Sequence, residues 1–277
     1  MKIALAQMNS GIVPEDNADQ LCSSIAEAAA GGATVIFTPE MSGLLDRDRS
    51  RAASAIRSEP EDAVLSAVRS AAQKAGIWVQ LGSLAIKNPD DPGAKWNNRS
   101  YLINPRGDIT ARYDKIHLFD VDLGPDESQR ESSAYAGGRN AVVAPVGEAT
   151  LGLSICYDLR FPALYEALTN AGADILSVPA AFTVPTGKAH WQILLRARAI
   201  EAGAFVVAAA QYGQHEDGRS TYGHSMVVDP WGDILLDMGE GAGIGFCDLD
   251  IGQVKAVRSR IPAVANRKSF AKPVPTR

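Results

Sequence analysis

The sequence predicts an α/β fold whose β-sheets are mixed and are covered by helices. Short β-rich runs alternate with amphipathic helical segments along the chain, which is the pattern of α/β proteins. Several β-rich runs are separated only by tight turns, as in antiparallel hairpins. Because a purely parallel sheet lacks such hairpins, we expect parallel and antiparallel strands within the same sheets.

The first half of the chain follows this alternation closely. The stretch Glu15–Ala30 carries apolar residues at helical spacing and is followed by Gly31, a residue type that commonly ends helices. A second amphipathic segment stops at Gly76 in the same way. A breaker-rich stretch, 88–93, is expected to be a surface turn. The expected helices are Glu15–Ala30 and Pro60–Ala75, and the expected strands are Lys2–Gln7, Thr34–Phe37, Ile77–Ile86, Ser100–Asn104 and Asp108–Tyr113.

The second half begins after a polar loop, Gly124–Gly138, whose length is typical of functional connections. The glycine-rich stretch Gly239–Gly245 mimics a dinucleotide-binding loop, but a strand follows it, so we interpret it as a flexible turn. Residues 1–262 are expected to form one domain and residues 263–277 a C-terminal tail. The expected elements are strands at Ala141–Val146, Ala149–Ile155, Ile175–Val178, Phe205–Ala210, Ser225–Asp229, Asp233–Asp237 and Phe246–Leu249, a loop at Ala180–Gly187, and helices at Phe161–Ala171, His190–Ala202 and Ile251–Arg260.

The composition is that of an ordinary globular protein, with 277 residues, 46% hydrophobic and 21% charged. Acidic and basic residues are interspersed at a net charge of -5, so no basic face for nucleic acid or a membrane surface is indicated. No apolar run approaches the roughly 18 residues of a membrane span, and the N-terminus lacks a signal peptide's apolar core. Three distant cysteines do not form a disulfide framework, so we expect a reducing, cytoplasmic location.

Three reactive groups, Glu40, Lys115 and Cys156, each follow directly on a β-rich run. Strand ends are where α/β folds collect reactive groups. Cys156 also precedes a helix start at Pro162, where unpaired N–H groups favour a thiolate. A carboxylate can take the proton of a thiol and return it to an amine, and an ammonium can stabilise an oxyanion. Taken singly, each residue has an ordinary alternative as a core cysteine, a surface carboxylate or a surface lysine.

Segments around these three residues resemble the signature segments of the carbon–nitrogen hydrolase (nitrilase) superfamily. They are Thr38–Glu40, Arg112–Phe119 and Cys156–Pro162, and further similar stretches are Ala181–Thr183, Thr186–Gly187, Ala189–Trp191, Leu195–Glu201 and Tyr222–Gly232. The resemblance covers nearly the whole chain, with the motifs in the family's order. It implies a four-layer α-β-β-α sandwich, which agrees with the mixed sheets, and an amidase that needs neither a metal nor another cofactor.

The resemblance also implies roles for individual residues. Cys156 would be the nucleophile, Glu40 the general base and acid, and Lys115 the group that stabilises the oxyanion. A second active-site glutamate is expected between the lysine and the cysteine, at Glu131 or alternatively at Glu127. Members of the family hydrolyse a small-molecule amide with water through a cysteine thioester. Family members usually dimerise, so we expect a homodimer. We expect no nucleic-acid or membrane partner.

The segments His190-Trp191 and Met226–Trp231 most resemble the Nit branch, whose members act as deaminated glutathione amidase or ω-amidase. The implied substrate is deaminated glutathione, with 2-oxoglutaramate or an N-carbamoyl amino acid as alternatives. Such an anion needs a cation, and Arg160 is the nearest one in sequence; the alternative for Arg160 is an ion pair with Asp158 or Glu166. The residues expected to contact substrate are Tyr157, Arg160, Phe182 and Thr186.

Other classes fit the sequence less well. The stretch Gly152–Cys156 lacks the final glycine of a serine-hydrolase elbow. A cysteine–histidine hydrolase would need His117, His190 or His224 as its base, and the histidines show no metal-ligand spacing. A catalytically silent binding module of the same fold is a further alternative, which the joint presence of the three reactive residues disfavours.

Overall fold

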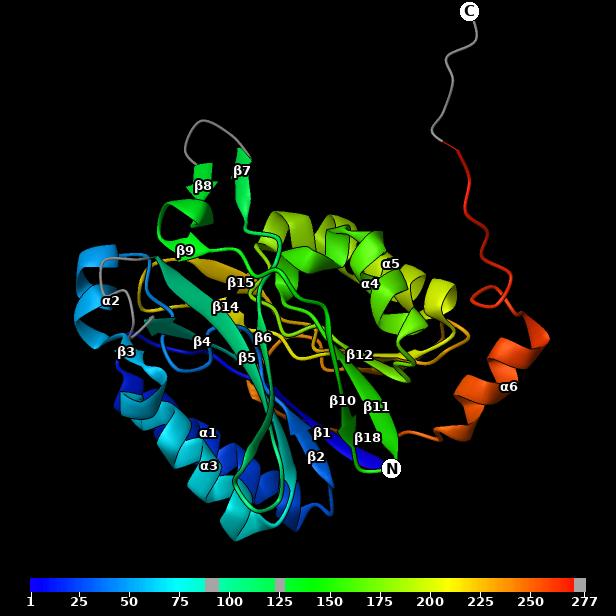
Figure 1. The fold of residues 1–277 in the computed structure, drawn as a ribbon. Helices are drawn as coiled ribbons and strands as arrows, with labels where there is room; N and C mark the ends of the chain where they lie inside the picture. Colours follow the sequence, from blue (N-terminus) through cyan, green and yellow to red (C-terminus); the bar gives the residue numbers. More distant parts are fainter. Residues whose placement is uncertain (88–94, 123–127, 272–277) are drawn as a thin grey trace, which may run out of the picture.

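The structure, a computed structural model, describes residues 1–87, 95–122 and 128–271. Its elements lie in four layers (Figure 1). Helices α1 (Pro14–Ala30) and α3 (Ala63–Ala75) cover the outer face of one large sheet, and helices α4 (Pro162–Asn170) and α5 (Val184–Ala202) cover the outer face of another. The inner faces of the two sheets pack against each other. The expected α-β-β-α sandwich is therefore confirmed.

The first sheet is mixed. Its central strands are parallel, and the outer pairs on both sides are antiparallel. Across the sheet the order is β18 (Gly243–Asp248), β1 (Lys2–Gln7), β2 (Val35–Phe37), β4 (Trp78–Lys87), β5 (Trp96–Ile103) and β6 (Ile109–Asp114), with the short strands β3 (Arg57–Ser58) and β9 (Tyr135–Ala136) paired to β4 and β5. Helix α3 begins at a cap in which Asp62 accepts the Leu65 N–H at 2.8 Å and ends at Gly76 with φ 68°.

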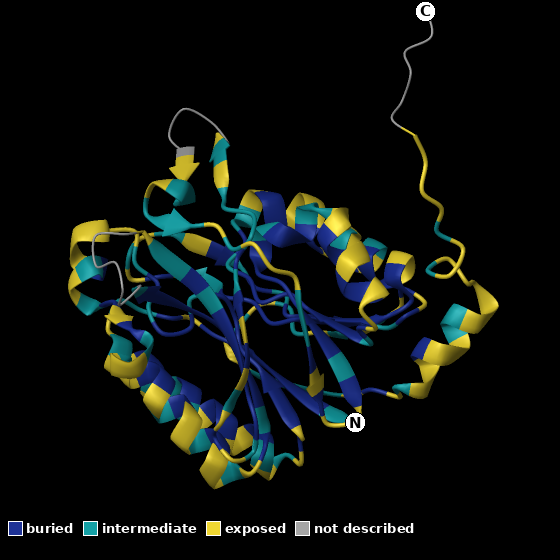
Figure 2. Cartoon of the chain, in the orientation of Figure 1, coloured by how far each residue is buried: buried dark blue, intermediate teal, exposed yellow. Residues whose placement is uncertain are grey.

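The second sheet is also mixed, with two parallel pairs flanked by antiparallel ones. Its order is β10 (Val142–Val146), β11 (Ala149–Leu153), β12 (Ile175–Ser177), β13 (Phe205–Ala208), β16 (Met226–Val228) and β17 (Ile234–Asp237). The inner strands are buried along their length, as Figure 2 shows by their dark blue colour. Each large aliphatic side chain buried here contributes about 1.5–3 kcal/mol, which fixes the strand ends that carry the site.

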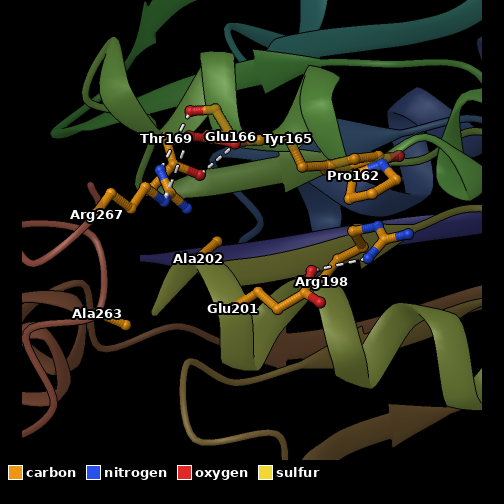
Figure 3. Close-up of a pocket in the computed structure, with 9 residues that line it drawn as sticks. All are labelled: Pro162, Tyr165, Glu166, Thr169, Arg198, Glu201, Ala202, Ala263 and Arg267. Atoms are coloured by element: carbon orange, nitrogen blue, oxygen red, sulfur yellow. Dashed lines mark hydrogen bonds and ion pairs between the residues drawn. The ribbon is translucent and has the colours of Figure 1, made fainter. Parts of the chain in front are cut away.

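The C-terminal part leaves the sandwich through helix α6 (Gly252–Arg260) and a mostly exposed segment. Arg267 of this segment reaches α4, where it donates to Asn170 Oδ1 at 2.7 Å and lies 3.9 Å from Glu166. A cavity of about 300 Å³ lies between this segment and helices α4 and α5 (Figure 3). The segment is thus tied to the outer helix layer.

Several local expectations were wrong. Helix α5 begins at Val184 rather than His190, because Pro185 is tolerated in a helix's first turn. The strand expected to reach Ile155 ends at Leu153, and the expected flexible turn at Gly239–Gly245 contributes its last residues to β18.

Short elements in polar stretches were not predicted. They are α2 (Arg49–Ala55), β3, β7 (Asp120–Asp122), β8 (Ser128–Arg130), the 3₁₀ turn η2 (Glu131–Ser133), β9, β14 (Tyr212–Gln214) and β15 (Ser220–Tyr222). The expected surface turn at 88–93 lies outside the described residues. Within the described ranges, no helix is long and apolar enough to cross a membrane.

Candidate active site

The three reactive residues predicted from strand ends lie together where the two large sheets meet. Glu40 follows β2 and Lys115 follows β6 in the first sheet, whereas Cys156 follows β11 in the second. The three side chains are buried, with exposed fractions of 5%, 2% and 7%. Two sheets thus supply one site, with the carboxylate and the ammonium on one side and the thiol on the other.

Glu40 is held by donors on both carboxylate oxygens. Its Oε1 accepts from Lys115 Nζ at 2.8 Å and from Asn98 Nδ2 at 2.9 Å. Its Oε2 accepts the backbone N–H of Ala181 at 3.1 Å, and the Cys156 thiol is within hydrogen-bonding reach of the same carboxylate. Such bonds to the charged form stabilise a carboxylate facing the thiol.

Lys115 lies between two carboxylates. Its Nζ donates to Glu40 and, at 2.9 Å, to Oε2 of Glu131, which also accepts the Phe119 N–H at 2.7 Å. Glu131 therefore belongs to the cluster, while its sequence alternative Glu127 lies outside the described residues. Burial by itself lowers the pKa of Lys115, but Glu131 and Glu40 outweigh burial and raise this pKa well above its usual value. The side chain stays an ammonium, and its third N–H has no acceptor among the described residues, so it can donate to a ligand.

Asn98 connects the two glutamates. Its Nδ2 donates to Glu40 Oε1 and, at 3.1 Å, to Glu131 Oε1, and its carbonyl accepts the Lys115 N–H at 2.9 Å. The side chain is fully buried, and its Oδ1 has no partner among the described residues. One side chain thereby fixes the positions of three charged groups. We refer to Glu40, Asn98, Lys115, Glu131 and Cys156 as the buried cluster.

Cys156 opens a 3₁₀ turn, η3 (Cys156–Arg160), which separates it from helix α4. Asp158, in the same turn, is fully buried and accepts the Ile155 N–H at 2.9 Å, the Tyr113 hydroxyl at 2.6 Å and the His117 N–H at 3.0 Å. Asp158 therefore joins the turn that carries the cysteine to the segment that carries Lys115.

The backbone is strained on both sides of the reacting pair. Cys156 has φ 49°, and Met41, the residue after Glu40, has φ 55°. Non-glycine residues rarely adopt this left-handed region, at a cost of about 1–3 kcal/mol each. In compensation, the Cys156 N–H donates to Pro179 O at 2.8 Å and the Met41 N–H donates to Ser83 Oγ at 2.9 Å. The surrounding structure thus imposes these conformations on both residues.

The thiol is not poised as a thiolate by a helix N-terminus, contrary to the expectation from sequence. Burial, and after it the Glu40 carboxylate, raise the pKa of Cys156 well above its ordinary value, although Lys115 acts in the opposite sense. The resting pair is therefore a neutral thiol beside a carboxylate, which requires that a base take the proton when the thiol reacts.

A cavity of about 800 Å³ opens onto the buried cluster. All four residues expected to contact substrate, Tyr157, Arg160, Phe182 and Thr186, line it. Aromatic side chains form part of its wall: Phe119 packs edge-on against Tyr157, and Phe182 packs against Trp191. The volume is within the range of small-molecule sites, which are mostly apolar with a few placed polar groups.

Arg160 makes no ion pair with Asp158 or Glu166. Asp158 faces His117, whose Nδ1 lies 2.7 Å away, and Glu166 faces Arg267. The Arg160 guanidinium instead lies over the Phe182 ring at 5.6 Å and the Tyr157 ring at 6.0 Å, and 3.3 Å from His190 Nδ1. Its remaining donors face the cavity with no carboxylate partner among the described residues.

The family model for carbon-nitrogen hydrolases matches residues 2–259 of the chain. The chain belongs to the carbon-nitrogen hydrolase family. Among curated relatives, the deaminated glutathione amidase of Yersinia enterocolitica is 37% identical over 99% of this chain and 95% of its own length. The deaminated glutathione amidase of Homo sapiens is 38% identical over 96% of this chain and 82% of its own length.

Solved structures of the family are similar throughout the chain. The NitFhit protein of C. elegans superposes with a TM-score of 0.89 at 36% identity, over 96% of this chain, which spans 65% of that longer protein. An amidase from Nesterenkonia sp. AN1, with acrylamide added at its active-site cysteine, superposes with a TM-score of 0.77 at 28% identity, over 95% of this chain and 98% of its own. The expected membership of the carbon-nitrogen hydrolase family is thus confirmed.

Two residues of this carbon-nitrogen hydrolase site, Asn98 and Asp158, had no assigned role in the sequence interpretation. Asp158 appeared there only as a partner for Arg160. Asn98 lies two residues before the expected strand Ser100–Asn104 and within the observed strand β5, without a motif of its own. The candidate histidine bases have other partners: His117 faces Asp158, His190 faces Arg160, and His224 faces Asp237 at 2.9 Å.

Proposed function

We propose that this carbon-nitrogen hydrolase is an amidase in which Cys156 is the nucleophile, Glu40 the general base and acid, and Lys115 the oxyanion-stabilising group. The proposal rests on one observation above all: a single carboxylate, Glu40, binds the lysine ammonium at 2.8 Å and lines the same ligand-sized cavity as the buried Cys156 thiol, whose pKa it raises. Glu131 holds Lys115 from the other side and keeps it aimed at the reacting carbonyl.

Acylation follows from this geometry. Glu40 takes the Sγ proton as the sulfur attacks the amide carbonyl, which forms a tetrahedral intermediate. The negative oxygen is stabilised by the third N–H of Lys115 and by the Tyr157 N–H, which has no acceptor among the described residues. Glu40 then passes its proton to the amine nitrogen, the C–N bond breaks, and the acyl group remains on Cys156 as a thioester.

Deacylation uses the same groups. Glu40, again a carboxylate, takes a proton from water, and the resulting hydroxide attacks the thioester carbonyl. Lys115 stabilises the second oxyanion, and the proton returns to sulfur as the carboxylic acid leaves. Lys115 keeps its proton through both half-reactions, which accords with its raised pKa.

Deaminated glutathione is the substrate we propose first, because it is the substrate of the relatives that are 37–39% identical. Arg160 supplies a cation for the carboxylate of its acyl part. The alternatives are 2-oxoglutaramate and N-carbamoyl amino acids, and a catalytically silent binding module is the alternative from another class. If kcat/KM is clearly higher for an N-carbamoyl amino acid than for deaminated glutathione and 2-oxoglutaramate, neither of these two amides is the preferred substrate.

The test is to incubate the protein with deaminated glutathione and measure both product and covalent adduct by mass spectrometry. We expect turnover by the wild-type protein and a transient acyl adduct on Cys156. Cys156→Ala should lower kcat by at least about 10³-fold, whereas Cys247→Ala, on β18, should leave it unchanged. Full activity in Cys156→Ala would exclude the mechanism, and an inert wild-type protein would favour the silent module.

We also propose that residues 1–262 act as one domain in the cytoplasm and that the protein is a homodimer. The exposed side chains Ile193 and Ile200 on α5, and the adjoining C-terminal segment, offer a surface for the second copy. Light scattering on the full chain should give twice the monomer mass, and a monomer at micromolar concentration would contradict the homodimer.

A further inference from the structure

Five arginines line the cavity and give it a cationic wall. They are Arg47, Arg49, Arg130, Arg160 and Arg219. The three carboxylates in the same wall offset them only in part, because Glu40 and Glu131 share Lys115, and Asp46 accepts two hydrogen bonds from Arg51 at 2.6 and 2.8 Å. The wall therefore carries a surplus of positive charge toward a ligand.

Three of these arginines are engaged by acceptors of the protein itself. Arg130 binds Asp122 at 2.7 Å, Arg219 binds Asp217 at 2.7 Å, and Arg49 donates to the Arg130 carbonyl at 2.7 Å. The guanidinium groups of Arg47 and Arg160 have neither a carboxylate nor a carbonyl acceptor among the described residues. Two cations of the cavity are thus available to a ligand.

The backbone of Arg47 is fixed although its side chain is exposed. Its N–H donates to Asp217 Oδ2 at 2.8 Å, and the Asp217 side chain is fully buried and held by Arg219. Two residues earlier, the Leu45 N–H donates to Gly11 O at 3.1 Å. The guanidinium therefore projects from a rigid support at the cavity wall, so that binding an anion orders few groups beyond the side chain itself.

Arg47 and Arg160 come from opposite walls. Arg47 lies on the loop that follows β2 and carries Glu40, on the side of the first sheet. Arg160 lies on the turn η3 that begins at Cys156, on the side of the second sheet. The cavity between these walls reaches Cys156, and its volume of about 800 Å³ exceeds what a small primary amide fills.

We propose that Arg47 forms a second carboxylate subsite, which binds an anionic group on the amine side of the scissile amide while Arg160 binds the carboxylate of the acyl side. The inference rests on the proposed amidase function and extends it. The favoured substrates are N-substituted amides in which a carboxyl-bearing acyl group is joined to an amino acid or short peptide with a free C-terminal carboxylate. A primary amide has no group that reaches Arg47.

The experiment compares two substrates that differ only at the proposed contact. The first is deaminated glutathione, which is the 2-oxoglutarate γ-amide of cysteinylglycine. The second is the same compound with its terminal carboxylate replaced by a neutral carboxamide. We expect wild-type kcat/KM to be about tenfold higher for the free carboxylate, mainly through KM, since an arginine–carboxylate pair at a partly exposed site supplies a contribution of that size.

Three single variants show which residue causes the difference in kcat/KM between the two substrates. In Arg47→Gln the two substrates should have similar kcat/KM, with kcat unchanged. In Arg160→Gln kcat/KM should fall by the same factor for both substrates. Arg106→Gln removes the same charge from the exposed β5–β6 turn and should leave the discrimination intact. Discrimination that survives in Arg47→Gln, or equal kcat/KM in the wild type, would refute the subsite.

The outcomes separate this inference from the function on which it rests. If the wild-type protein hydrolyses neither compound nor 2-oxoglutaramate, the amidase proposal fails. If it hydrolyses 2-oxoglutaramate alone, the amidase proposal stands and the subsite fails. If it hydrolyses both compounds equally well, the amidase proposal stands and the subsite fails. Thermal melting of each variant shows whether it folds normally. If a variant folds poorly, the comparison of the two substrates in the wild-type protein still tests the subsite.

Discussion

The buried cluster and the cavity arginines are both charged, yet they differ in how firmly the protein holds them. In the buried cluster, Lys115 donates to two carboxylates, Asn98 donates to the same two, and every side chain except that of Glu131 is nearly inaccessible to water. Among the arginines, Arg47 and Arg160 line the cavity, and their guanidinium groups meet no carboxylate or carbonyl oxygen within the part of the chain that the structure describes. One set has its geometry fixed in advance, and the other has its charge exposed to a ligand.

This difference separates two tasks. Chemistry at a thiol requires a base and an oxyanion donor at set distances before substrate arrives, because their reorganisation would add to the barrier. Recognition of a carboxylate tolerates a solvated cation, since binding a ligand replaces water around it. Substitutions in the buried cluster should therefore lower kcat, whereas substitutions among the arginines should raise KM.

Glu40→Gln is expected to have the largest effect on the cluster. The amide keeps the size of the side chain but cannot take the thiol proton, so kcat should fall by about 10³-fold, within the usual range for losing a general base. Rapid-quench assays would follow acylation and product release separately. Glu27→Gln, on the solvent side of α1, is the matched control, and normal acylation in Glu40→Gln would place the base elsewhere.

Asn98→Leu should have a smaller but clear effect. The substitution removes both donors that fix the glutamates while keeping a similar volume, so we expect kcat to fall by about 10- to 100-fold with little change in KM. Single-turnover assays should show that the acylation step is slowed, because the two glutamates are no longer held in place by a common donor.

The neighbouring Asn97 provides the control for this variant. Successive side chains of a strand point to opposite faces, and Asn97 is only half-buried, so Asn97→Leu should leave kcat and KM unchanged. If Asn98→Leu keeps the wild-type kcat and acylation rate while melting at the same temperature, Asn98 does not position the glutamates.

The parts of the molecule that sequence could predict are those where one residue marks a sharp local change. Pro39 breaks a β-rich run just before Glu40, and a polar turn follows the apolar strand at Cys156, so both site positions could be predicted from the sequence. The role of Asn98 could not be predicted, because Asn97 and Asn98 are the same residue type and only the strand's register decides which one faces the cluster.

The long-range contacts that position Arg47 and the short polar elements could not be predicted from the sequence either. Arg47 is placed by Asp217, and Asp217 lies 170 residues further along the chain in a polar hairpin, β14–β15, that has no apolar alternation. Helix α2 is seven residues long and rich in charge, and it depends on the Asp48 cap, whose side chain accepts from the Ser50 and Arg51 N–H groups. Short polar elements of this kind are stabilised by tertiary contacts rather than by periodicity.

The smallest expected effect concerns the pH dependence of stability. Burial and Glu40 raise the pKa of Cys156 in the folded protein, whereas the unfolded chain releases this proton near pH 8.5. Above that pH the unfolded state binds fewer protons than the folded state, so stability falls by about 1.4 kcal/mol for each further pH unit until the folded-state pKa is reached.

Guanidinium unfolding of the wild type and of Cys156→Ala between pH 7 and pH 10 isolates this contribution from other titrating groups. The difference in unfolding free energy between the two proteins should be constant up to about pH 8.5 and then shift in favour of Cys156→Ala. Cys22→Ala, which removes a half-buried thiol on α1, should shift less. Parallel curves for wild type and Cys156→Ala would mean that folding does not raise the pKa of the Cys156 thiol. A difference that grows in favour of the wild type between pH 7 and pH 8.5 would mean that the resting thiol is already ionised and that Glu40 is not needed to take its proton.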